Sequence, residues 1–326
     1  MAEAGNAASQ AAAHFRFDDY RSRLAPQTIR RQDADLDLFA EFLYSVMVHR
    51  VGDLHRDAEA WRGVTWGLVE AFVKWQLKEG YAVTSVNVRL STVKTYARLA
   101  FQAGTLSAEE YALIRSVQGY SQREKRRIDA RRKQTRVGAK KETPVTLSPE
   151  QAAALKNQPL DTPQGCRDAL LMALMLDHGL RAGEVASLTL EALDLKAGML
   201  RFYRPKVGKT QNHRLSSDAI RAAQCYTKIL ASESPSSPLI RRVHRGGKVL
   251  GAAAMTTRGI SLRVAELGKR IGIEGLSAHD LRHAWATQAA RAGIDPFRLQ
   301  QAGGWSSLAM PRRYVEDSAI ANEGME

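Results

Sequence analysis

Two histidines and an arginine stand close together in the stretch LSAHDLRHAWATQAARAG, in a chain with only eight histidines among 326 residues. Ser277, followed three residues later by Asp280, is typical of a helix N-terminus, so a helix is predicted to begin there. His279 and Arg282 are then one turn apart on one face, at the positive end of the helix dipole. This spacing predicts an anion-binding site.

Other residues that could bind or attack an anion stand on both sides of this stretch. HGLRAGEVASLTLEAL contains Arg181 with Glu184 three residues later, between an apolar segment and the next predicted helix. AGGWSSLAMPRRYVED contains Trp305 and Tyr314. Any one of these residues alone is more often structural than functional, and it is their order along the chain that indicates a function.

That order resembles the tyrosine recombinase (phage integrase) family. Its pattern is an arginine in a G-L-R-x-x-E context, a lysine on a β-hairpin, H-x-x-R, a histidine or tryptophan, and a tyrosine. QAGGW is most similar to the Cre-type branch, since most members have histidine at the position of Trp305. The resemblance implies a mainly α fold with a small β-sheet. A SAM-like all-helical core-binding domain would precede an α+β catalytic domain of the DNA breaking-rejoining fold.

The resemblance also implies a reaction. A phosphodiester is anionic and reacts slowly, so a site without metal must neutralise the charge that builds on the phosphorus oxygens. Two guanidiniums, those of Arg181 and Arg282, would form this clamp, because each presents a planar fork to two oxygens. Tyr314 would be the nucleophile. Its product, a 3′-phosphotyrosyl bond, retains the cleaved linkage without ATP.

Three further residues would assist Tyr314. By resemblance, a hairpin lysine protonates the departing 5′ oxygen as general acid. Lys209, beside the expected turn at Gly208, fits best, and Lys206 is close enough to compete. His279 would act as general base or phosphate donor, and the indole N–H of Trp305 could donate to a nonbridging oxygen.

Supporting roles are expected for two residues, and no cofactor is expected. Glu184 would position the arginine and histidine, and His283 completes the family's frequent H-x-x-R-H form with a structural role. Cys166 and Cys225 are neither CxxC-spaced nor beside a histidine cluster, so we expect two separate core thiols and no zinc site.

The net charge of +14 indicates a polyanionic partner, double-stranded DNA. Residues 1–120 are balanced, with 14 Lys/Arg and 14 Asp/Glu, whereas residues 121–142 contain 10 and 3. The candidate DNA contacts, selected by charge and position, are Arg89, Lys94, Arg126, Arg127, Arg131, Arg132 and Lys133.

The domain organisation follows from periodicity and charge. We expect a disordered tail over 1–17, a helical DNA-binding domain over 18–120, a basic linker over 121–144 that lies along phosphates, and a catalytic domain over 145–326. Four helices are predicted in the first domain, beginning near Pro26, Thr65, Thr84 and Ser107. In the second, a helix follows Ser148, CRDALLMALMLDHGL is the buried central helix, and GMLRFYRPKVGKTQNHRLSS is the one strand-like region.

These observations predict a site-specific recombinase that cuts and rejoins duplex DNA. By resemblance it would be a monomer or weak dimer in free solution and a tetramer on two synapsed sites, passing through a Holliday junction. Accessory DNA-bending or directionality proteins would be further partners. Only 12 residues follow Tyr314, so the C-terminal segment that relatives donate to a neighbouring subunit is short.

The expected location is cytoplasmic and nucleoid-associated. No apolar run reaches the roughly 20 residues that cross a bilayer, and the N-terminus lacks the features of a signal peptide.

Two alternatives remain open from the sequence. A type IB topoisomerase uses the same residue types, and a DNA relaxation assay without a specific site would separate it from a recombinase. A DNA-binding regulator without catalysis would keep its cellular activity when Tyr314 is changed to phenylalanine.

Overall fold

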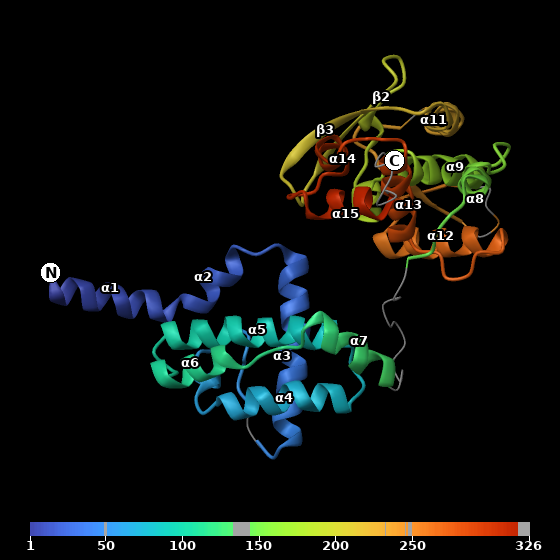
Figure 1. Cartoon of the computed structure of the whole chain (residues 1–326). Coiled ribbons are helices and arrows are strands. Elements are labelled where there is room, and N and C mark those ends of the chain that lie inside the picture. Colours follow the sequence, from blue (N-terminus) through green and yellow to red (C-terminus); the bar gives the residue numbers. More distant parts are fainter. Residues whose placement is uncertain (49–50, 133–143, 232, 245, 247–249, 319–326) are drawn as a thin grey trace. The chain divides into compact units, whose positions relative to one another are not determined.

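The structure, a computed structural model, divides the chain into two compact units, residues 1–140 and 141–326. Each unit has its own hydrophobic core, and the described residues contain no helix that could span a membrane. Figure 1 shows the elements of both units. The residues described are 1–48, 51–132, 144–231, 233–244, 246 and 250–318.

Helices make up the regular structure of the N-terminal unit within its described residues. The four predicted helices are confirmed, and the side chains of Thr65 and Ser107 cap two of them. The carboxylate of Glu110 does not close a capping box, because it accepts a hydrogen bond from the Trp66 N–H (2.6 Å) of the neighbouring helix. The confirmed helices are α3 (Pro26–Ser45), α4 (Trp66–Lys78), α5 (Val83–Gln102) and α6 (Ala108–Ser116), and η1 (Glu59–Trp61) is a single 3₁₀ turn.

The expectation of a disordered tail over residues 1–17 is wrong. α1 (Ala2–His14) and the beginning of α2 (Arg16–Ser22) occupy this segment. Alanine has the highest helix propensity of all residues, and Phe17 is buried in the N-terminal core. The helix propensity of alanine and the burial of Phe17 therefore favour helices in a segment whose composition suggested disorder.

The expected linker over residues 121–144 is helical in its first half, which corrects its description as a simple linker. α7 (Gln122–Arg131) begins with a capping box. The Asp129 carboxylate of α7 accepts a hydrogen bond from the Val83 N–H (3.1 Å) at the first residue of α5. Since the first N–H groups of a helix lack partners within it, this contact attaches α7 to the N-terminal unit.

The C-terminal unit is built around α9 (Pro163–Leu176), the predicted buried helix. Its side chains are buried without interruption from Gly165 to Leu176. The helices with the most extensive contacts to it (Figure 1) are α8 (Pro149–Lys156), α11 (Ser217–Ile229) and α13 (Ala278–Arg291). The remaining helices are α10 (Ala182–Ala186), α12 (Thr257–Arg270), α14 (Pro296–Gly303) and α15 (Ala309–Ser318), with one 3₁₀ turn, η2 (Leu190–Ala192).

The predicted strand region forms an antiparallel sheet in the order β1-β2-β3. β1 spans Leu193–Asp194, β2 Met199–Arg204 and β3 Lys209–Arg214. A second sheet, β4 (Arg241–Val243) with β5 (Leu250–Ala254), was not predicted. Strands this short carry too few residues for an alternating pattern to be recognised.

The expectation of two separate core thiols is wrong. Cys166 of α9 and Cys225 of α11 form a disulfide with a Cα–Cα distance of 5.9 Å. The packing of α11 along α9 brings them together across 59 residues of sequence, a proximity that their spacing could not reveal.

Candidate active site

The beginning of α13 is fixed by Asp280. One carboxylate oxygen accepts hydrogen bonds from the N–H (2.8 Å) and hydroxyl (2.7 Å) of Ser277, which confirms the predicted capping box. The other accepts from the Val145 N–H (3.1 Å). His279 is therefore held on the first turn, where it is exposed, and Arg282 on the next, where it is buried.

Arg282 lies inside the unit with 3% of its surface exposed. Its guanidinium donates to the carbonyl oxygens of Gly179 and Gly303, each at 2.5 Å. It also lies over the Trp305 ring, 4.2 Å from the centroid. Burial, followed by repulsion from neighbouring guanidiniums, lowers the pKa of Arg282 to about 9, so the group is still a cation at neutral pH.

Arg181 and a second arginine share the carboxylate of Glu184. Arg181 donates to one oxygen through Nη1 (2.7 Å) and to the other through its backbone N–H (2.8 Å). The second oxygen also accepts from Nη1 of Arg204 (2.8 Å), a fully buried residue of β2. Burial lowers the pKa of Arg204, and the Glu184 carboxylate opposes that shift. Glu184 thus holds two like charges close together.

The last carbonyls of α14 receive the site's donors, and we call carbonyls 301–304 the carbonyl row. The last carbonyl groups of a helix lack partners within it and form the negative end of its dipole. Cations are therefore favourable there. The pairs, in order, are Gln211 Nε2 to Gln301 (2.6 Å), Arg204 Nη2 to Ala302 (2.7 Å), Arg282 Nη2 to Gly303 (2.5 Å) and Arg181 Nη2 to Gly304 (3.1 Å).

The two glycines of AGGW allow this close approach. Gly304 caps α14 in the left-handed conformation (φ 59°), which favours glycine. A Cβ there would lie 2.4 Å from Cδ of Arg204, and a Cβ on Gly303 would lie 1.8 Å from the Trp305 ring. The backbone at this turn therefore has no space for side chains.

Tyr314 lies on α15 with 3% of its surface exposed. Its ring is 5.0 Å from that of His283 and 5.9 Å from that of Trp305, between centroids. Trp305 in turn stacks on Trp285 at 6.0 Å. The fold thus brings together Tyr314, Trp305 and Arg282. His283 also contacts the Tyr314 ring.

The two candidate lysines are both exposed on the β2–β3 hairpin. Lys209 is directly opposite Arg204 in the register, and directly opposed residues extend from the same face of a sheet. Lys209 therefore lies on the same face of the sheet as Arg204, whereas Lys206 lies in the connecting turn.

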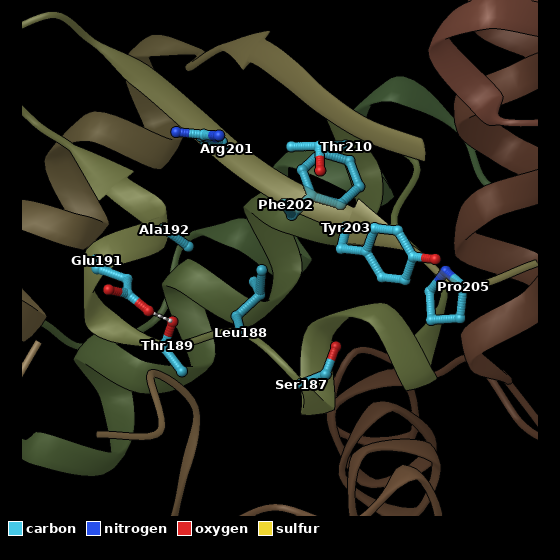
Figure 2. A pocket seen from close by; sticks show the side chains of 10 residues that line it. All are labelled: Ser187, Leu188, Thr189, Glu191, Ala192, Arg201, Phe202, Tyr203, Pro205 and Thr210. Carbon is cyan, nitrogen blue, oxygen red and sulfur yellow. Dashed lines mark hydrogen bonds between the residues drawn. The ribbon is translucent and has the colours of Figure 1, made fainter. Parts of the chain in front are cut away.

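A pocket of about 530 Å³ lies against the hairpin, between β2, the end of α10 and the η2 turn (Figure 2). Its wall includes Tyr203 and Thr210, which pair across the two strands. None of the ten residues that line it is a predicted catalytic residue. The hairpin thus borders this pocket, and hydrogen bonds from Arg204 and Gln211 connect it to the carbonyl row.

Sequence reasoning missed Arg204 and Gln211. A signal was present, because Leu200, Phe202 and Arg204 alternate along β2 and all three are buried. A charged residue at the inward position of an alternating strand needs a buried partner, and that requirement predicts a network.

Three of the candidate DNA contacts also have partners within the N-terminal unit. Arg89 donates to Gln76 (3.2 Å) and lies over the Tyr81 ring, 4.1 Å from its centroid. The Lys94 ammonium donates to the carbonyls of residues 115 and 117. Arg132 donates to the carbonyl of residue 80 (2.9 Å). Partial burial of their charge would be costly without these partners, so these contacts stabilise the N-terminal unit, and a DNA contact of the three residues stays a prediction.

The other candidates lie on α7, except Lys133, which lies outside the described residues. Arg126, Arg127 and Arg131 are exposed, and so is Arg123. The spacing of 123, 127 and 131 places three guanidiniums on one helix face. α7 therefore presents a basic stripe, Arg123, Arg127 and Arg131.

No group of histidine, cysteine and carboxylate side chains in the described part of the chain could hold a metal ion.

Comparison with known proteins identifies the family. The model of the phage integrase family matches residues 146–319, which is more than half of the chain. The chain belongs to the phage integrase family. It is a site-specific tyrosine recombinase, an enzyme that cleaves and rejoins DNA.

Relatives and solved structures agree with this family. The tyrosine recombinase XerC of Roseiflexus castenholzii is 27% identical over 298 residues, covering 90% of this chain and 83% of that protein. Lambda integrase bound to DNA has the same fold, with a TM-score of 0.60, 17% identity and coverage of 96% of this chain and 99% of that one. A lambda integrase tetramer bound to a Holliday junction has a TM-score of 0.57, 17% identity and coverage of 95% and 78%.

The turn at Gly303 provides the first prediction. Gly303→Ala should displace the Trp305 ring from the Arg282 guanidinium and lower the rate of DNA cleavage by about 10²-fold, the usual effect of an error of about 1 Å in catalytic geometry. The measurement is single-turnover cleavage of a DNA substrate. Gly183→Ala is the control, because its nearest neighbour would be 4.0 Å away. Equal rates for both variants would contradict the role of the turn.

Proposed function

We propose that this integrase-family enzyme recombines two duplex DNA sites through attack of Tyr314 on a phosphodiester held by Arg181 and Arg282. The supporting observation is the carbonyl row, which binds both guanidiniums at adjacent carbonyls, with Arg282 over the Trp305 ring. Each of these guanidiniums has five N–H donors in a planar fork, so donors remain for a phosphate after the contacts described above. Two fixed cations stabilise charge that develops on the phosphorus oxygens.

In the proposed cleavage step, the phenolic oxygen of Tyr314 bonds to phosphorus and the bond from phosphorus to the 5′ oxygen breaks. His279 accepts or shares the phenolic proton, and Lys209 donates a proton to the departing 5′ oxygen. The indole N–H of Trp305 donates to a nonbridging oxygen. Rejoining reverses these transfers with a 5′ hydroxyl from the partner strand, so no external energy source is required.

The proposed assembly is a tetramer on two synapsed sites that passes through a Holliday junction. It is supported by the fold shared with lambda integrase, which has been solved as a tetramer on such a junction. Free in solution, the chain would be a monomer or weak dimer. Accessory DNA-bending or directionality proteins would select the outcome of recombination.

The proposed DNA contacts of the N-terminal unit lie on α7. Its basic stripe is exposed, and its internal face is attached to α5 through Asp129. A helix held in this way can present three charges to phosphates without ordering a flexible segment, which reduces the entropic cost of binding.

The nucleophile is tested with a suicide duplex, nicked next to the candidate site in the DNA that flanks the gene. With EDTA present, the wild-type enzyme should form a denaturation-resistant adduct at a 3′ phosphate, and Tyr314→Phe should form none. An adduct in both would assign the nucleophile to another residue. Tight DNA binding without any adduct would favour a regulator, and relaxation of DNA that lacks the site would favour a topoisomerase.

The general acid is tested by comparing Lys209→Ala and Lys206→Ala on two substrates. Loss of the acid should slow cleavage of ordinary DNA by about 10²–10⁴-fold. A substrate with sulfur in place of the 5′ bridging oxygen should restore the rate, because thiols are far more acidic than alcohols and leave without protonation. We expect this restoration for Lys209→Ala. Restoration for Lys206→Ala instead would assign the acid to the turn.

The basic stripe is tested through the salt dependence of DNA binding. Replacing Arg123, Arg127 and Arg131 by alanine should weaken binding and reduce the slope of log K against log[salt] by about 0.9 for each lost phosphate contact. Arg62→Ala is the control, an exposed arginine paired with Glu59. An unchanged slope in the triple variant would exclude α7 from the interface.

A further inference from the structure

Arg204 lies outside the set of residues expected from the family pattern. We propose that it is a positioning residue for DNA cleavage, and this inference rests on the proposed function. It would act through Glu184 on Arg181 and through Gln211 on the hairpin that carries the candidate acids.

Arg204 connects four segments of the C-terminal unit from a position with no exposed surface. From β2, Nη1 donates to Glu184 of α10 (2.8 Å) and Nη2 to the carbonyl of Ala302 on α14 (2.7 Å). Nε donates to the side-chain oxygen of Gln211 on β3 (2.5 Å). All three nitrogens therefore contact different elements of the site.

This geometry requires an arginine. The three donors leave a rigid planar fork in different directions, whereas a lysine would offer one ammonium at the end of a flexible chain. Gly304 fits closely against the same side chain, since a Cβ there would lie 2.4 Å from Cδ of Arg204. A positive charge alone therefore explains neither the three hydrogen bonds of Arg204 nor its close fit against Gly304.

The contact with Glu184 aims Arg181. Glu184 is buried, and its two oxygens are divided between the two arginines. Without Arg204, one oxygen would keep only the Arg181 backbone N–H as a donor, and the whole negative charge would act on Arg181. The clamp would lose both a fixed orientation and part of its net positive charge.

The contact with Gln211 fixes the hairpin. Gln211 accepts from Arg204 and donates to the carbonyl of residue 301 (2.6 Å). It stands two residues after Lys209 and on the same face of β3. The two hydrogen bonds of Gln211 thus fix the position of the hairpin relative to α14. In this way they would also determine how close its lysines come to the phosphate.

The experiment compares Arg204→Met, Arg204→Lys and Gln211→Ala in the full-length chain. Single-turnover cleavage is measured on ordinary DNA and on DNA with sulfur at the 5′ bridging position, together with DNA binding and thermal unfolding. Arg263→Lys is the matched control, since Arg263 is also a buried arginine paired with a carboxylate, that of Asp168, away from the site.

We expect both Arg204 variants to cleave ordinary DNA about 10²-fold more slowly, with unchanged DNA affinity. The sulfur substrate should restore Gln211→Ala, because Arg204 keeps its contact with Glu184 in this variant and the loss falls mainly on the hairpin. It should restore Arg204→Met only in part, because the Arg181 contact is also lost. Arg263→Lys should lower thermal stability and cleave like the wild type.

Three results would overturn the inference. If Arg204→Lys cleaved at the wild-type rate, a positive charge at this position would be sufficient. If Arg204→Met cleaved at the wild-type rate, Arg204 would have no role in cleavage. If Arg263→Lys lost as much cleavage activity as the Arg204 variants, the loss would reflect reduced stability. If the Arg204 variants do not fold, the inference is tested by Gln211→Ala alone, and failure of the sulfur substrate to restore its cleavage rate would contradict it. Wild type and Tyr314→Phe are measured in parallel, so failure of the wild type to form an adduct would count against the proposed function instead.

Discussion

The site depends on the negative end of one short helix. Carbonyls 301–304 at the end of α14 accept side-chain donors from β3, β2, α13 and the N-terminus of α10, and the Gln301 carbonyl also accepts the cap N–H of Gly304. Guanidiniums repel one another, and the unsatisfied carbonyls of a helix end offset that repulsion at close range. α14 can serve in this way because its last residue and its cap are glycines, which leave the carbonyl oxygens open to approach.

Glu184 is the second constraint, because it is the buried carboxylate among three cations. It holds Arg181 and Arg204 directly, and it partly opposes the decrease in the pKa of Arg282. A buried cluster of this kind contributes little to stability compared with apolar packing. Its presence is better explained by function, in which charge must be fixed before the substrate arrives.

Much of this arrangement could be predicted from sequence, and the rest could not, for identifiable reasons. The beginning of α13 was predictable because a capping box is a local signal, and α9 because a continuously apolar helix must be buried. The internal partners of Arg89 and Lys94 could not be predicted, because charge and position do not reveal whether a cation has a partner within the fold. Gln211 was missed because its importance depends on Arg204 and α14, which meet it only in the folded chain.

The contacts of the clamp with its own backbone have a consequence for selectivity among anions. Arg181 and Arg282 already donate to carbonyls of residues 303 and 304. In the proposed clamp, an incoming phosphate would meet guanidiniums whose charge is partly compensated, and would gain less than it would from bare cations. A small anion has only this clamp to bind, whereas a duplex adds many backbone contacts at once. The proposed clamp would thus favour long polyanions over free phosphate or nucleotides, and abundant small anions would compete poorly for the site.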